Sequence, residues 1–108
     1  VVMAFKHLTV AQAKELLANP ATVIADIRDA NTYSKGHIPQ AVNLSNANIG
    51  QFMIEQEFEH PIIVVCYHGI SSQGAANYLN EQGFEDVYSL DGGFEAWATS
   101  CADNIERS

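Results

Sequence analysis

The run Pro61-Ile62-Ile63-Val64-Val65-Cys66 is the most apolar stretch of the chain and leads directly into Tyr67-His68-Gly69-Ile70-Ser71-Ser72. An apolar run without alternation, rich in β-branched residues, is typical of a strand buried on both faces of a sheet. Behind the loop, the helical spacing of Ala75, Ala76 and Leu79 predicts a helix over residues 72–82 that Gly83 closes. A strand, a short loop and a helix in this order predict a parallel α/β fold.

Further strands and helices are expected to alternate along the chain before and after this unit. Strands are predicted over residues 5–8, 22–27, 41–44 and 86–90, and helices after Thr9, over residues 29–35 and 48–57, and after Gly93. Thr9 with Gln12 three residues later is the pattern of a capping box. The alternation implies a mostly parallel sheet covered on both sides, with its ligand crevice beyond the carboxyl ends of the strands. Cys66 stands at that end of the central strand.

Composition limits the kinds of partner that the chain can have. Its 108 residues leave room for one domain, and 47% hydrophobic with 17% charged residues suits an ordinary globular core. A net charge of −8 disfavours nucleic acid and anionic membranes. No apolar run approaches the roughly 20 residues needed to cross a bilayer, and no secretory signal is visible. With only two cysteines, a reducing compartment is expected, and we predict a cytoplasmic location.

The loop after Cys66 has features that stabilise an anion. Gly69 permits backbone angles that let the loop curl back over the cysteine and turn its N–H groups toward the sulfur. The following helix adds its free N–H groups and the positive end of its dipole. These features predict a thiol pKa below the usual value of about 8.5. His68 within the loop and Arg28 at a neighbouring strand end are candidate cations.

Packing explains some of these residues without any chemistry. Cys66 could be an inert thiol at the end of a core strand, since free cysteine is among the most buried residue types. Cys101 shares a helical face with Phe94 and Trp97, and its spacing predicts packing. Function is therefore favoured for Cys66 but not for Cys101.

Other chemical interpretations of the polar residues remain open. Asp26, Arg28 and Asp29 fit a plain ion-pair cluster at a strand end. The cysteine and histidines lack the spacing of a zinc site, so no metal is expected. A Cys–His–Asp hydrolase would need His37 or His68 as its base, and the sequence alone does not place either one.

Three segments resemble the motifs of the rhodanese family, in the order that the family has them. They are Asp26-Ile27-Arg28-Asp29 with Tyr33 and Gly36-His37-Ile38-Pro39-Gln40-Ala41-Val42-Asn43, then the loop from Cys66 to Ser71, then Leu90-Asp91-Gly92-Gly93-Phe94-Glu95-Ala96-Trp97. The loop sequence and the short length most resemble the single-domain GlpE-type members. The resemblance implies one α/β domain over residues 1–108, with its core at about residues 5–100. It also implies a five-stranded parallel sheet with helices on both faces.

The resemblance further implies a thiosulfate:cyanide sulfurtransferase that needs no cofactor. The Cys66 thiolate would attack the outer sulfur of thiosulfate, sulfite would leave, and a Cys66 persulfide would remain. Cyanide or a thiol, such as that of a thioredoxin-like protein, would then accept the sulfur. Backbone N–H groups of the loop would hold the persulfide, and the candidate loop residues are Tyr67, His68, Gly69, Ile70, Ser71 and Ser72. Arg28 and Asp29 are candidates for supporting residues.

The chain also departs from the family pattern around the loop. Two-domain members carry cations at the two positions where this chain has Tyr67 and His68, and many relatives carry arginine at the position of Ser71. Ile70 replaces a polar residue and makes the rim more apolar. Fewer fixed cations in a negative overall field predict weak thiosulfate binding with a strong salt dependence.

Three rival functions follow from the same residues. A cysteine phosphatase needs an arginine after five intervening residues to grip phosphate, and this chain has Ser72 there. A non-catalytic rhodanese-like docking module often loses the cysteine, so retention of Cys66 argues against it. A sulfur-relay protein with a dedicated protein persulfide donor would share the Cys66 persulfide, and it stays open as an alternative.

Overall fold

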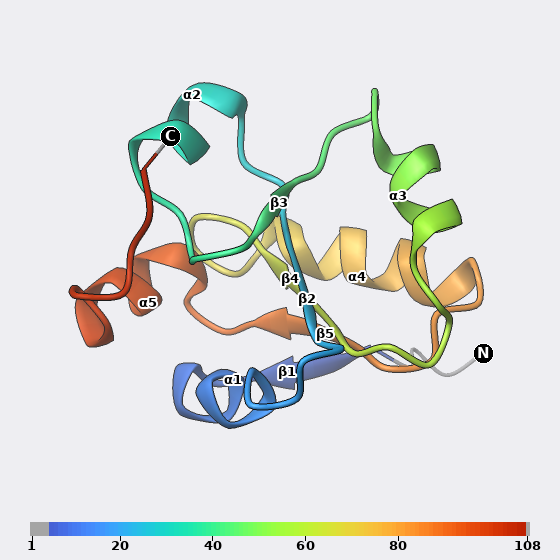
Figure 1. The fold of residues 1–108 in the computed structure, drawn as a ribbon, viewed down its shortest axis with the longest axis horizontal. Coiled ribbons are helices and arrows are strands. Elements are labelled where there is room, and N and C mark those ends of the chain that lie inside the picture. The colour runs from blue at the N-terminus through green and yellow to red at the C-terminus, as the bar shows by residue number, and fades with distance from the viewer. Residues whose placement is uncertain (1–4, 108) are drawn as a thin grey trace.

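Five parallel strands form one sheet in the order β1-β5-β4-β2-β3, with helices on both of its faces (Figure 1). The computed structural model describes residues 5–107 of the chain. The strands are β1 (Lys6–Leu8), β2 (Val23–Asp26), β3 (Val42–Asn43), β4 (Ile62–Val65) and β5 (Val87–Leu90). The helices are α1 (Val10–Leu16), α2 (Ala30–Lys35), α3 (Ile49–Glu55), α4 (Ser71–Glu81) and α5 (Gly93–Ser100). The α/β architecture predicted from the sequence is confirmed.

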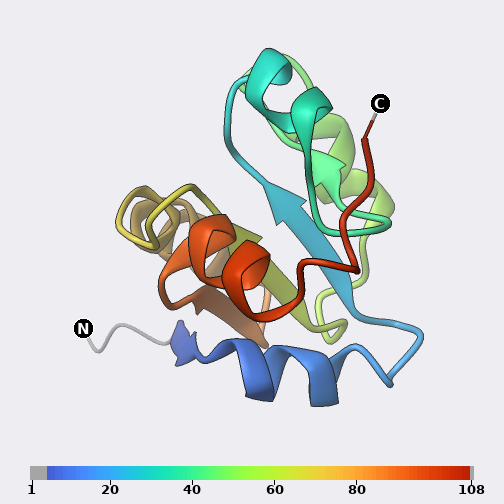
Figure 2. The same ribbon diagram turned by 90° about the vertical axis from the view of Figure 1, so that its left-hand side faces the viewer.

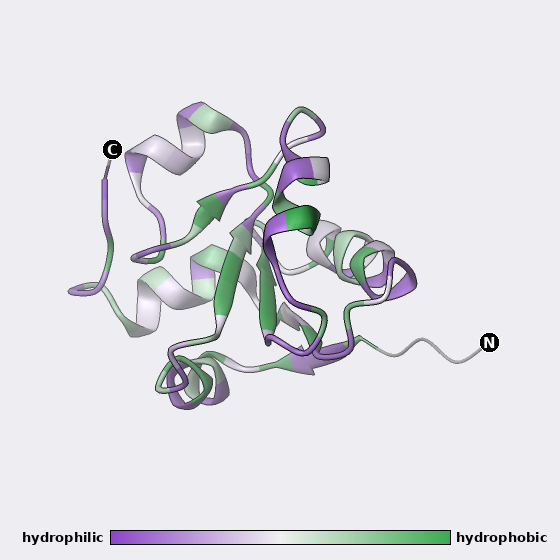
Figure 3. Ribbon diagram, turned by 45° about the vertical axis from the view of Figure 1, so that its right-hand side comes forward, coloured by the Kyte–Doolittle hydropathy of each residue, from purple (hydrophilic) through white to green (hydrophobic). Residues whose placement is uncertain are grey.

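The central strand β4 is buried on both faces, as its unbroken apolar run predicts. Ile62 and Val64 belong to one apolar core, and Ile63 and Val65 to the other. All four side chains are at most 1% exposed, so each face of the sheet is covered. Figure 3 shows the same contrast, with hydrophobic central strands and polar residues along the outer parts of the helices.

Each core is closed by two helices. α1 and α5 lie together on one face, where Ala13 and Trp97 are buried (Figure 2). α3 and α4 cover the other face through Phe52, Ala76 and Leu79. Cys101 is buried in the same core as Phe94 and Trp97, which confirms its predicted packing role.

Local hydrogen bonds set the ends of several helices. Thr9 and Gln12 form the predicted capping box at the start of α1. The helix expected over residues 48–57 ends earlier, at Glu55, because Gln56 already has an extended backbone. α4, with 11 residues, is the longest helix. None of the helices within residues 5–107 is long and apolar enough to span a membrane.

The strand register brings three loops to one edge of the sheet. Asp26 of β2 pairs with Val65 of β4, and the Ile27 amide donates to the Val65 carbonyl at 2.9 Å. The segment after β2 therefore runs beside Cys66, which directly follows β4. On the other side, Ser89 of β5 pairs with Val64, so the turn after β5 reaches the same edge. Cys66 thus lies where the crevice of a parallel sheet is expected.

Candidate active site

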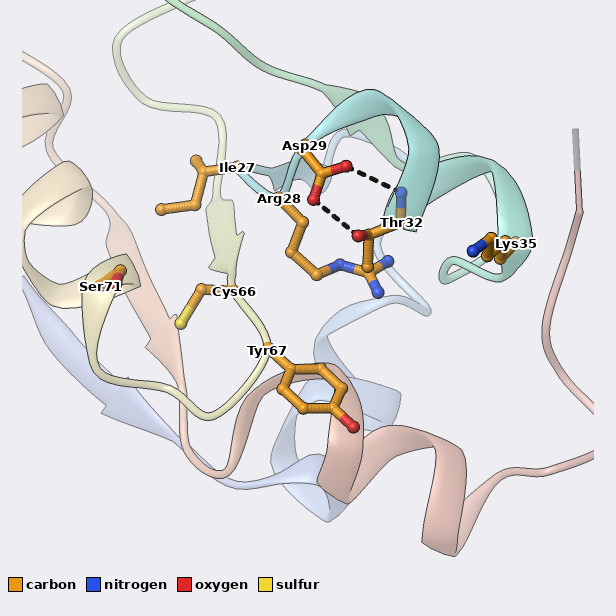
Figure 4. A pocket seen from close by; sticks show the side chains of 8 residues that line it. All are labelled: Ile27, Arg28, Asp29, Thr32, Lys35, Cys66, Tyr67 and Ser71. Carbon is orange, nitrogen blue, oxygen red and sulfur yellow. Dashed lines mark hydrogen bonds between the residues drawn. The ribbon is translucent and has the colours of Figure 1, made fainter.

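A pocket of about 610 Å³ opens at this edge, with Cys66 in its wall (Figure 4). Its lining comes from the end of β2, from α2, and from the loop between β4 and α4. The lining residues are Ile27, Arg28, Asp29, Thr32, Lys35, Cys66, Tyr67 and Ser71. Although the pocket is large, Cys66 is only 6% exposed. The Cys66 side chain is therefore largely covered by its neighbours, although the pocket reaches it.

The loop after Cys66 curls around the sulfur in the way that its glycine predicts. Gly69 has a φ of +87°, in the left-handed region that side chains avoid. Its N–H donates to Cys66 Sγ at 3.0 Å. Ser72, in the first turn of α4, places Oγ 3.3 Å from the same sulfur. The sulfur therefore faces hydrogen-bonding groups from both ends of the loop.

These contacts favour the thiolate form of Cys66. Burial by itself raises the pKa of the thiol, because it disfavours the charged form. The Ser72 hydroxyl and the N–H groups of Ser72, Gly69 and His68 act against burial and outweigh it, so the Cys66 pKa lies below its ordinary value. The direction agrees with the prediction from sequence, and its cause is neutral hydrogen-bond donors rather than a cation. This arrangement therefore makes the sulfur more nucleophilic than an ordinary buried thiol.

The turn into α5 supports the loop from behind. The Phe94 N–H donates to the Cys66 carbonyl at 2.8 Å, and the Glu95 N–H donates to the Tyr67 carbonyl at 3.1 Å. Gly93, with a φ of +60°, leaves room for these carbonyls, since a Cβ there would collide with both. Gly93, Phe94 and Glu95 thus shape the loop after Cys66 although none of them lines the pocket.

Arg28 forms an ion pair inside the protein. Its guanidinium binds the buried Asp26 carboxylate, with Nε–Oδ1 at 3.0 Å and Nη2–Oδ2 at 2.7 Å, and also donates to the Gly36 carbonyl at 2.8 Å. It lies over the Phe94 ring, 4.2 Å from the centroid. Arg28 lines the pocket, but Asp26 balances its charge.

Within residues 5–107, the neighbouring Asp29 forms no such ion pair and instead caps a helix. Its carboxylate caps α2 by accepting from the Thr32 N–H at 3.1 Å and from the Thr32 hydroxyl at 2.6 Å (Figure 4). These hydrogen bonds, that of the Thr32 hydroxyl first, lower the pKa of Asp29. Ion pairing and capping thus account for the Asp26–Asp29 cluster, the simpler of the interpretations that the sequence left open.

The histidines do not assemble with Cys66 as a hydrolase would require. His68 lies at the surface, with Nδ1 3.3 Å from Glu95 Oε1. The buried His37 has Nδ1 2.8 Å from the Tyr33 carbonyl oxygen, and its ring stacks on that of Tyr33. Within residues 5–107, no imidazole forms a hydrogen bond with the Cys66 sulfur. Since no general base is placed, a Cys–His–Asp hydrolase is disfavoured.

Three residues near the cysteine escaped the sequence analysis. Thr32 and Lys35 reach the pocket from α2, a helix that the sequence predicts but does not place beside Cys66; the pairing of β2 with β4 brings it there. Lys35 has no carboxylate partner in the described part of the chain. Ser89 of β5 lies behind the sulfur, with Oγ 2.8 Å from Ser72 Oγ. No local sequence signal marks a strand serine of this kind.

Comparison with known proteins gives a consistent family assignment. The family model of the rhodanese-like domain matches residues 9–100. The chain is 64% identical over 105 residues to the thiosulfate sulfurtransferase GlpE of Pseudoalteromonas translucida, covering 97% of this chain and 100% of that protein. Over 93 residues it is 55% identical to the protein of the same name from Shewanella oneidensis, covering 86% of this chain and 92% of that protein.

Solved structures agree with the fold. The solution structure of the rhodanese-like domain of an Anabaena protein superimposes with a TM-score of 0.82 at 28% identity, over 94% of this chain and 79% of that one. A rhodanese-like domain protein from Staphylococcus aureus shares the fold with a TM-score of 0.80 at 24% identity, covering 96% and 99%. From its matched residues, its relatives and its architecture, the chain belongs to the rhodanese-like domain family.

Proposed function

We propose that this protein is a thiosulfate sulfurtransferase that carries sulfur as a persulfide on Cys66. In the first half-reaction, the Cys66 thiolate attacks the outer sulfur of thiosulfate. A bond forms between Sγ and that sulfur, the sulfur–sulfur bond of thiosulfate breaks, and its electron pair leaves with sulfite. In the second, the acceptor attacks the outer sulfur and the electron pair returns to Sγ as a thiolate. No external oxidant or reductant is needed.

The observation that carries this proposal is the hydrogen-bonded sulfur of Cys66. The Gly69 N–H lies 3.0 Å from Sγ, and the N–H groups of His68 and Ser72 face the same atom. Such dipoles stabilise a thiolate and would also hold the negative outer sulfur of a persulfide. The two GlpE relatives at 64% and 55% identity are named thiosulfate sulfurtransferases, which supports the same chemistry here.

Charge at the pocket bears on the choice of donor. Because Asp26 neutralises Arg28, Lys35 is the lining cation that has no carboxylate partner within residues 5–107. One such cation in a chain of net charge −8 supports weak binding of the thiosulfate dianion. The strong salt dependence expected from the sequence stays a prediction.

For the acceptor, we propose cyanide or a thiol, including that of a thioredoxin-like protein. Cyanide is small enough to reach the sulfur of a residue that is only 6% exposed. Tyr67 and Ile70, which are 48% and 75% exposed, give the rim an apolar surface that suits a protein thiol. A cytoplasmic location is part of this proposal, since a free reactive thiol needs a reducing compartment.

Intact-mass measurement tests the proposal. The reduced protein is incubated with thiosulfate, freed of small molecules and weighed, in parallel with Cys66→Ser and Cys101→Ser. We expect one added sulfur atom on the parent and on Cys101→Ser, and none on Cys66→Ser. Thiocyanate release on adding cyanide would then show turnover. The mechanism is wrong if the parent gains no sulfur or if Cys66→Ser gains it equally.

The same measurement separates the sulfur-relay alternative. A relay that depends on a dedicated protein donor would gain no sulfur from thiosulfate but would gain it from a protein persulfide. A docking module would gain sulfur from neither. The pocket around Cys66 and the lowered pKa of its thiol favour a reactive role over docking.

A further inference from the structure

Two buried hydroxyl groups behind Cys66 form a pair that the reaction scheme above does not include. Ser72 Oγ lies 3.3 Å from Cys66 Sγ, and Ser89 Oγ lies 2.8 Å from Ser72 Oγ. Both serines are fully buried, at 0% exposure. Ser72 belongs to the first turn of α4 and Ser89 to β5, so the packing of α4 on the sheet brings them together. A polar side chain at each of these core positions needs an explanation beyond packing.

We propose that Ser89 is a positioning residue for sulfur transfer, which acts through Ser72 to orient the hydroxyl proton toward the Cys66 thiolate. A serine hydroxyl has one donor and two acceptor sites. When Cys66 is a thiol, its S–H donates to Ser72 and Ser72 donates to Ser89. When Cys66 is a thiolate, the order reverses: Ser89 donates to Ser72, and Ser72 donates to the sulfur. Both hydroxyls keep a partner in either state, and no heavy atom has to move.

Ser89 strengthens the second of these states. A hydroxyl that accepts one hydrogen bond donates a stronger one, and the effect is larger in a site shielded from water. Without Ser89, Ser72 would donate to the sulfur with nothing polarising it from behind. The chain thus extends the stabilisation of the thiolate from the loop to the neighbouring strand.

The two half-reactions respond to this stabilisation in opposite ways. A better stabilised thiolate is a weaker nucleophile once fully ionised, but it is a better leaving group when the persulfide gives up its sulfur. Loss of Ser89 should therefore slow sulfur release to cyanide while it raises the intrinsic reactivity of the ionised thiol. A loosened structure would not produce this pair of changes. This kinetic part rests on the proposed function, whereas the ionisation of Cys66 does not.

The test is the pH profile of iodoacetamide alkylation, followed on the Cys66 peptide, in Ser89→Ala, Ser72→Ala and the double variant. Thiolate displaces iodide in this reaction, so its rate reports ionisation and needs no thiosulfate. We expect Ser89→Ala to raise the Cys66 pKa by about half a unit and Ser72→Ala by about one unit. The double variant should match Ser72→Ala, because Ser89 acts only through Ser72.

The reaction rates provide a second readout. For Ser89→Ala, the plateau alkylation rate at high pH should rise about 1.5- to 2-fold, and discharge of the persulfide to cyanide should slow by about twofold. The ionisable groups that face the pocket from other elements, Arg28, Asp29 and Lys35, are unchanged in every variant, as are Tyr67 and His68 of the loop.

Two control variants separate the hydroxyl from its surroundings. Val87→Ala removes a fully buried side chain from the same strand and the same core and leaves both serines in place. It should lower stability without shifting the Cys66 pKa. Ser89→Thr keeps the hydroxyl and should keep the parent profile. The proposal is overturned if Ser89→Ala leaves the profile unchanged, if its effect persists in full beside Ser72→Ala, or if Val87→Ala shifts the pKa equally.

Discussion

The Phe94 amide donates a hydrogen bond to the Cys66 carbonyl oxygen across 2.8 Å and so links α5 to Cys66. The Glu95 amide binds the Tyr67 carbonyl in the same way. In a trans peptide the N–H points opposite to the carbonyl of the same unit. When α5 holds the Tyr67 carbonyl, the His68 N–H is therefore turned away from α5, and it is one of the groups that face the sulfur. The shape of the anion site thus depends on α5.

A methyl group at Gly93 should break this link. Its Cβ would collide with the Cys66 and Tyr67 carbonyl oxygens, at a φ of +60° that already disfavours a side chain. We expect Gly93→Ala to raise the Cys66 pKa and to slow sulfur loading by more than tenfold. The measurement is the rate of the one-sulfur mass increase, together with the alkylation profile.

Gly74→Ala is the matched control for Gly93→Ala. Gly74 lies within α4, and a Cβ there would meet nothing within 4 Å. This change should raise the free energy of unfolding by about 0.5–1 kcal/mol and leave sulfur loading unchanged. If Gly93→Ala behaved like Gly74→Ala, the supporting role of α5 would be wrong.

Removal of the Lys35 charge should weaken thiosulfate binding. Lys35→Gln is expected to raise KM for thiosulfate about two- to fivefold at low ionic strength, with little change in kcat, because the ammonium attracts the dianion before the chemical step. The difference should shrink at physiological salt. Steady-state kinetics of Lys14→Gln, the same charge change on α1, provide the comparison, and an equal rise in KM there would mean that net charge alone is responsible.

Arg28 should prove to be a residue of the fold. Arg28→Gln leaves the buried Asp26 carboxylate without its partner, and we expect a loss of about 3–5 kcal/mol in the free energy of unfolding by urea. Asp26→Asn combined with Arg28→Gln should recover part of that loss. The Cys66 pKa of the folded variants should stay at the parent value. A near-normal stability combined with lost activity would instead point to contact with substrate.

Ionisation of Cys66 should also appear in the stability of the protein. Because the folded-state pKa lies below the unfolded one, the contribution is present above the unfolded pKa and is lost as the pH falls through the folded pKa. The free energy of unfolding of the parent minus that of Cys66→Ser should therefore rise with pH across that interval. A difference that stays flat with pH would mean that Cys66 ionises equally in both states.

Much of the fold was predictable because its signals are local. The unbroken apolar run at Ile62–Val65 indicated a strand buried on both faces, and Thr9 with Gln12 indicated a helix start. The curl of the loop around Cys66 was predictable in the same way, since Gly69 closely follows the cysteine. The ends of helices were harder to predict where no capping residue marks them. α3 stops at Glu55 although the sequence continues in a helical pattern to residue 57.

The rest of the site depends on contacts between distant segments, which a sequence does not display. Arg28 is different, because the sequence offered it both as a candidate cation near the sulfur and as part of an ion-pair cluster, and the structure shows the ion pair with Asp26. Lys35 and Ser89 lie 31 and 23 residues from Cys66 along the chain, and only the strand register brings them near it. The positions of Lys35 and Ser89 near Cys66 therefore follow from packing.

The residues that surround the sulfur and the lysine that lines the pocket come from separate elements of the fold. This separation affects which properties of the pocket a substitution can change. The groups around the sulfur come from the loop after β4 and from α4, and α5 binds the backbone of that loop. Lys35, which has no carboxylate partner within residues 5–107, stands instead on α2, a helix of six residues at the pocket wall. Substitutions in α2 can alter which anion is drawn in while the groups around the sulfur stay as they are. Preference for a sulfur donor can therefore change through substitutions in α2 without any change at Cys66.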